Sequence, residues 1–234
     1  MDKETVQFIR KLGIPLGFVC FIWIIHLLQA ITGIDLVRLG VSPRDIDGLP
    51  GILTGPMIHG SWEHLFFNSV SFMIMGAIMF WFYPSIALRS IIWMYLLSGL
   101  GIWLIGQPHS YHIGASGVVY GMVSFVFWSG VFRRNVKSIV LALIVLVLYA
   151  GFFEGIIPGK EGISWEGHLM GGISGIIIAF LYRKAIETDE VEPELEEEEE
   201  EKKFLLPRDT FDMTMAQRRA LNEEQGAGGK GHRA

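Results

Sequence analysis

The chain has 234 residues, of which 51% are hydrophobic and 18% are charged, whereas an ordinary globular protein has about 25% charged residues. This composition and the mean hydropathy of +0.42 exclude a typical soluble domain and indicate an integral membrane protein. The net charge is −5, and the single cysteine, Cys20, excludes an intramolecular disulfide.

Apolar runs of membrane-spanning length recur along the chain. A transmembrane helix needs roughly 17–25 mostly apolar residues, and six runs approach or reach this length: 12–31, 64–83, 86–105, 116–132, 138–153 and 167–182. The fifth run is short. We therefore expect an all-α, polytopic membrane protein with a six-helix bundle over residues 1–186.

The basic residues predict the orientation, because insertion retains short loops rich in Lys and Arg in the cytoplasm. With six spans, one side has only Arg38, Arg44 and Lys160, and the other has nine basic residues: Lys3, Arg10, Lys11, Arg89, Arg133, Arg134, Lys137, Arg183 and Lys184. Both termini are expected in the cytoplasm. A signal peptide is disfavoured, since the first apolar run is too long and no small-x-small site follows it.

Two segments outside the spans have a distinctive composition. The first outer loop, 32–63, is rich in Gly and Pro but also in large apolar residues, so we expect it to pack against the bundle or dip into the outer leaflet; a plain surface loop is the alternative. Residues 187–234 include an acidic run at 196–201 and are expected to form a mostly disordered cytoplasmic tail, in which a short helix at 211–221 is possible.

Polar residues stand near the expected outer ends of three spans. His64 and Asn68 are four residues apart and so share one helix face, as do Ser116 and Tyr120. Small-xxx-small faces on the fourth and sixth spans, which allow close helix packing, consist of Gly117, Gly121, Gly167, Gly171 and Gly175. If these faces meet, Ser116 and His168 come within hydrogen-bond reach. Each feature alone has a structural alternative, namely helix packing.

Taken together, these motifs resemble the rhomboid intramembrane serine proteases. The resemblance rests on HGSWEHLFFN at 59–68, GASG at 114–117 with Tyr120, and Gly167-His168 with Gly171 and Gly175, in this order over residues 10–186. It implies a six-helix core, a catalytic dyad reached by water from the outer face, and an endopeptidase that cuts membrane proteins within or next to a transmembrane segment.

The resemblance also implies a role for each motif residue. Ser116 would be the nucleophile and His168 its base. The supporting and oxyanion residues would be Asn68, His64, Gly114, Tyr120 and His59. Glu166 is a poor third member of the site, because it lies two residues along the helix from His168. His109 and His112, just before the serine motif, are near enough to line the site, without an assigned role.

No metal, organic cofactor or nucleic-acid partner is expected; the expected partners are single-pass membrane proteins and the bilayer. The absence of a mitochondrial-type presequence favours a bacterial inner membrane. Many rhomboid proteins have a Trp-Arg pair in the first outer loop, where this chain has Pro43-Arg44, so the anchor of that loop is open. Gly155, Pro158 and Gly159 suit a mobile cap over the site or an ordinary flexible loop.

Other classes fit the sequence less well. The zinc-protease motif HExxH is absent, and no aspartate lies in a predicted span, which excludes an aspartyl protease. The remaining alternative is a catalytically silent rhomboid-like protein that binds client transmembrane helices. Such a protein usually lacks the serine or the histidine, and both are present here.

Overall fold

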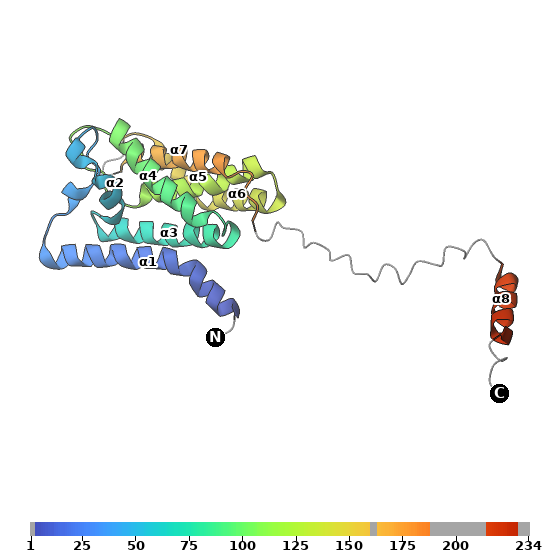
Figure 1. Ribbon diagram of the computed structural model, residues 1–234. Coiled ribbons are helices and arrows are strands. Elements are labelled where there is room, and N and C mark those ends of the chain that lie inside the picture. Colours follow the sequence, from blue (N-terminus) through green and yellow to red (C-terminus); the bar gives the residue numbers. More distant parts are fainter. Residues whose placement is uncertain (1–2, 160–162, 188–213, 229–234) are drawn as a thin grey trace. The chain divides into compact units, whose positions relative to one another are not determined.

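A computed structural model describes residues 3–159, 163–187 and 214–228 (Figure 1). The chain forms two compact units, Met1–Val191 and Glu192–Ala234. Helix α8 (Met215–Gly228) belongs to the second unit and overlaps the helix that the sequence allows at 211–221. The expected disorder of the tail falls mainly on residues 188–213, which lie outside the described residues.

The described part of the first unit is helical and contains no β-strand, so the all-α prediction is confirmed. The long helices are α1 (Lys3–Thr32), α3 (Trp62–Phe82), α4 (Ala87–Ile105), α5 (Ser116–Arg133), α6 (Val136–Leu148) and α7 (Trp165–Leu181). The short ones are η1 (Val37–Leu39), η2 (Ile46–Gly48), α2 (Gly51–Thr54), η3 (Gly55–Met57) and η4 (Ala150–Ile156).

Three described helices are by themselves long and apolar enough to cross a membrane: Lys11–Thr32 within α1, α3 and α4. A fourth span results if α6 and η4 are counted together, and α7 is apolar but shorter. Many large apolar side chains on the outside of the bundle are exposed, Leu16, Ile24, Trp93 and Leu148 among them, as a lipid-facing surface requires. The number of six spans stays a prediction.

The fifth span differs from its prediction. The sequence predicts one helix over 138–153, but α6 ends at Leu148 and the chain bends by 66° into η4. Apolar residues continue through the bend, so hydropathy does not mark it. Gly151 and Gly155 disfavour a continuing α-helix, and a Cβ on Gly155 would lie 2.9 Å from Nδ1 of His168. The bend therefore brings η4 against α7.

Helix α5 lies at the centre of the bundle and contacts α3, α4, α6 and, most extensively, α7. The two glycine faces meet, which is the condition that the sequence analysis sets for contact between Ser116 and His168. A Cβ on Gly171 would lie 2.0 Å from the carbonyl oxygen of Gly117, and one on Gly175 would lie 2.3 Å from that of Gly121. Both distances are far below van der Waals contact, so only glycine allows this approach of the two backbones.

The first outer loop packs against α4, so the plain surface loop is excluded. The Arg44 guanidinium donates to the Gly106 carbonyl at 2.8 Å, and the backbone N–H of Arg44 donates to the Trp103 carbonyl at 2.9 Å. The Trp103 indole N–H donates to the Asp45 carbonyl at 2.7 Å. A backbone bridge between Val41 and His112 joins the same loop to the segment before α5. Arg44 thus anchors the loop without a preceding tryptophan.

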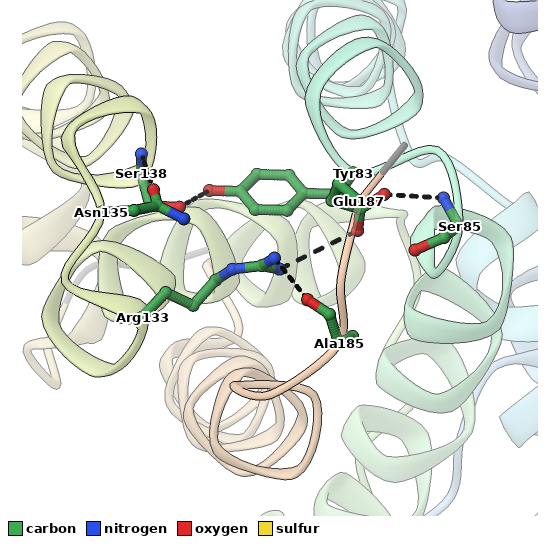
Figure 2. A network of polar contacts seen from close by, with 7 residues as sticks. All are labelled: Tyr83, Ser85, Arg133, Asn135, Ser138, Ala185 and Glu187. Carbon is green, nitrogen blue, oxygen red and sulfur yellow. Dashed lines mark hydrogen bonds and ion pairs between the residues drawn. The ribbon is translucent and has the colours of Figure 1, made fainter. Parts of the chain in front are cut away.

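A polar network joins the helix ends opposite Ser116 (Figure 2). Glu187 is fully buried, accepts a hydrogen bond from the Ser85 backbone N–H at 3.0 Å and pairs with Arg133 at 3.9 Å. Arg133 also donates to the Ala185 carbonyl and lies over the Tyr83 ring. Glu187 therefore packs with the bundle, one residue beyond the boundary that the sequence predicts at residue 186.

Candidate active site

Ser116 is the first residue of α5, where backbone N–H groups have no partner within the helix and the helix dipole favours negative charge. The preceding turn depends on Gly114, whose φ of 101° is unfavourable for any residue with a side chain. This turn presents Ser116 at the helix N-terminus, beside the first turn of α7.

The structure brings Ser116 and His168 together. His168 lies in the first turn of α7, which begins at Trp165 rather than at the predicted Gly167. Its Nε2 lies 2.9 Å from Oγ of Ser116, which is a hydrogen-bond distance. The predicted contact between Ser116 and His168 is therefore present.

A backbone carbonyl orients the imidazole. Nδ1 of His168 lies 2.9 Å from the carbonyl oxygen of Gly155 in η4. A carbonyl can only accept, so Nδ1 carries the proton and Nε2 presents its lone pair to Ser116. The Tyr120 ring stacks on the imidazole at 3.9 Å between centroids, and its hydroxyl donates to the Phe152 carbonyl at 2.9 Å. Stacking and the hydrogen bond to Gly155 fix the orientation of the imidazole.

Asn68 and His64 of α3 converge on the space beside Gly114. A Cβ on Gly114 would lie 2.5 Å from the His64 ring and 3.4 Å from Nδ2 of Asn68. Nδ2 of Asn68 is buried and donates to no acceptor among the described residues. A buried amide without an acceptor is costly, so Asn68 has an unused donor beside the turn that presents Ser116.

His59 lies behind this site and is fully buried. Its ring is 5.0 Å from that of His64, and its Nε2 accepts a long hydrogen bond, 3.5 Å, from the Ala115 backbone N–H. Burial, together with the neighbouring His64 and His26, lowers the pKa of His59 to about 3. A neutral His59 thus supports both the turn before Ser116 and the ring of His64.

An open cavity of about 1020 Å³ connects these groups. Its wall includes all the expected polar groups except His59, namely Ser116, His168, Tyr120, Asn68 and His64. His112, Ser164 and Glu166 also line it, but His109 does not. Within the described residues, no cluster of His, Cys, Asp or Glu is arranged to hold a metal ion.

Two sets of contacts at this site cannot be found by sequence analysis. One is the hydrogen bond from His168 to the Gly155 carbonyl, because residue type does not reveal which backbone carbonyl will accept. The other is a chain of hydrogen bonds through His112: its Nδ1 lies 2.7 Å from Oγ of Ser164, and its Nε2 lies 3.0 Å from Oγ of Ser110. Ser164 caps α7 by accepting from the Gly167 backbone N–H at 3.1 Å. His112 thus connects the segment before Ser116 to the helix of His168.

Comparison with known proteins identifies the family. A family model of the rhomboid domain matches residues 48–185. The chain is 35% identical over 178 residues to the uncharacterized protein Rv1337 of Mycobacterium tuberculosis, an alignment that covers 71% of this chain and 72% of the relative. It is 32% identical to the uncharacterized protein ML1171 of Mycobacterium leprae, over 71% and 69% of the two chains. The Bacillus subtilis protein YdcA, provisionally named a rhomboid protease, is 24% identical over an alignment that covers 56% of this chain and 65% of YdcA. The chain is an integral membrane protein that belongs to the rhomboid family.

Proposed function

We propose that this protein is an intramembrane serine endopeptidase that cuts membrane proteins within or next to a transmembrane segment. The observation that carries the proposal is the 2.9 Å contact between Ser116 and His168 at the wall of a cavity. A serine becomes a nucleophile when an adjacent base accepts its proton, and Nε2 of His168 is free to do so because Gly155 binds the proton on Nδ1.

The reaction follows the general scheme of serine hydrolases. Oγ of Ser116 attacks the scissile carbonyl while His168 takes its proton and then gives it to the leaving amine. The Asn68 amide, His64 and the Ser116 backbone N–H stabilise the oxyanion. Water deprotonated by His168 hydrolyses the acyl-enzyme and restores Ser116. No step calls for a metal or an organic cofactor.

The proposed setting is a bacterial inner membrane, with both termini in the cytoplasm, single-pass membrane proteins as substrates and no nucleic-acid partner. The second candidate is a catalytically silent protein that binds client transmembrane helices. Family membership is compatible with both. The assembled contact between Ser116 and His168 favours the enzyme, since helix binding alone requires neither residue.

The test combines labelling with substitution. A serine-directed phosphonate should form an adduct on Ser116 of the purified protein, and the wild type should cleave a membrane-protein reporter. Ser116→Ala and His168→Ala should each abolish cleavage, and the double variant should be no slower than either single one, because nucleophile and base act as a unit. Cleavage by folded Ser116→Ala at the wild-type site would falsify the serine mechanism. A wild type that binds the reporter without cutting it would support the silent alternative.

A further inference from the structure

Glu166 is a carboxylate in the wall of the candidate active site that the proposed reaction does not use. It lies in the first turn of α7, is 7% exposed and lines the same cavity as Ser116 and His168. Among the described residues that line this cavity, it is the only Asp, Glu, Lys or Arg. The described part of the wall therefore has one carboxylate close to Ser116 and His168.

This carboxylate has no ion pair and no hydrogen bond with the rest of the described chain. Burial lowers the pKa of the nearby His112. The negative charge of Glu166 acts in the opposite direction and raises that pKa, but by less. A cationic group that enters the cavity could form a charge-assisted hydrogen bond with this carboxylate.

Helix stabilisation does not account for this placement. A carboxylate in the first turn of a helix interacts favourably with the helix dipole, and Glu63 has this position in α3 while remaining exposed. Glu166 has the same position in α7 but lies in the wall of the cavity, with 7% of its surface exposed. A favourable position at the helix N-terminus therefore does not by itself explain why Glu166 lines the cavity.

We propose that Glu166 selects substrates that carry a Lys or Arg side chain next to the scissile bond. This inference rests on the proposed protease function and specifies its substrate class. Glu166 and His168 are two residues apart on α7 and line one cavity, so a long side chain beside the reacting carbonyl can reach the carboxylate. Trp165 and Tyr111 also line the cavity, and their rings suit the apolar stem of such a side chain.

The test uses matched transmembrane reporters that differ only in one residue, Lys or Gln, placed in turn at each position flanking the cut. For wild-type protein, kcat/KM should favour Lys at one position by about tenfold, the effect of one charge-assisted hydrogen bond. Glu166→Gln should lower kcat/KM for that Lys reporter to the Gln value and leave the Gln reporter unchanged. Glu166→Lys should shift the preference to a reporter with Glu at that position.

Glu63→Gln is the matched control, because it removes the same charge from the first turn of a helix outside the cavity; it should preserve the preference for Lys. Equal rates on Lys and Gln reporters in the wild type would refute the inference and leave the protease function intact. Equal slowing of both reporters by Glu166→Gln would also refute it, since Glu166 would then only support α7. Failure of the proposed function itself is recognisable separately, as absence of both cleavage and Ser116 labelling in the wild type.

Discussion

Asn68 is a buried amide whose donor has no acceptor among the described residues, beside the turn that presents Ser116. If it donates to the oxyanion, Asn68→Ala should lower kcat by roughly 10²–10³, the loss typical of one such donor. KM should change little and the melting temperature should not fall, because Nδ2 of Asn68 makes no hydrogen bond that the substitution would remove. Cleavage kinetics of Asn68→Ala on a membrane-protein reporter in detergent measure this change in kcat. If the variant retains the wild-type kcat, or loses activity only because it unfolds, Asn68 is a packing residue.

His59 makes the stability of the protein depend on pH. Its pKa is about 3 in the folded protein and about 6.5 in an unfolded chain, so the unfolded state binds more protons between these values. The contribution of His59 to stability should be constant well above pH 6.5 and fall as the pH drops toward 3, by up to about 1.4 kcal/mol per pH unit. Thermal unfolding at several pH values measures the slope.

His59→Gln should make that slope shallower. His109→Asn is the control, since His109 is an exposed histidine outside the cavity; it should leave the slope unchanged. An unaltered slope in His59→Gln would mean that the pKa of His59 is the same in the folded protein as in the unfolded chain.

Sequence reasoning finds residues whose type and spacing are both distinctive. Ser116, His168, Asn68 and His64 stand in motifs of fixed spacing, and the structure brings them together. Sequence reasoning cannot find the Gly155 carbonyl as an acceptor for His168, because every residue has a backbone carbonyl and only the fold decides where each one points.

At the scale of secondary-structure elements, His112 joins the segment before α5 to the N-cap of α7. His112→Phe retains a ring but loses both hydrogen bonds, so α7 and His168 should shift and kcat should fall by about 10- to 100-fold, as a misplacement near 1 Å can cause. His112→Asn has an amide oxygen that can replace Nδ1 as the acceptor for Ser164 and should recover most of the rate.

Ser164→Ala should lower kcat at least as much as His112→Phe does, because it breaks the bond to His112 and also removes the cap on the Gly167 backbone N–H. The loss in the double variant should be smaller than the sum of the two single losses, since they share the bond between Ser164 and His112. Rates of phosphonate labelling at Ser116 and kcat on a reporter measure the effect. Additive losses, or no rescue by His112→Asn, would show that the two residues act separately.

The elements themselves are predictable where hydropathy changes sharply. The ends of α3 and α4 lie within two residues of their predictions. The bend after Leu148 escapes prediction because the residues on both sides are apolar, and the geometry depends on contacts of Gly155 with other helices. The anchor of the first outer loop escapes it because Arg44 and Trp103 are far apart in sequence.

At the scale of the whole molecule, the network around Glu187 sets the minimum length of the membrane unit. The composition predicts that truncation after Ile186 leaves activity within a few-fold, but this cut removes the buried partner of Arg133. Breaking a buried ion pair costs about 3–5 kcal/mol. We therefore expect truncation after Ile186 to lower the melting temperature clearly and truncation after Val191, which retains Glu187, to preserve it.

Thermal unfolding in detergent compares the two truncations, and Glu187→Gln in the full chain separates the charge from chain length. Equal melting temperatures for the two truncations would mean that the Arg133 pair contributes no net stability and that the boundary at residue 186 is adequate.

The bend after α6 has a consequence for timing. The segment η4 holds both acceptors that orient the base: Gly155 binds the proton on His168, and Phe152 binds the hydroxyl of Tyr120. Displacement of η4 to admit a substrate helix from the bilayer would withdraw both acceptors at once and leave the imidazole free to turn. A site that opens by moving η4 is thus inactive while open, and chemistry resumes only after the segment has closed again over the bound chain. Opening and catalysis would then alternate.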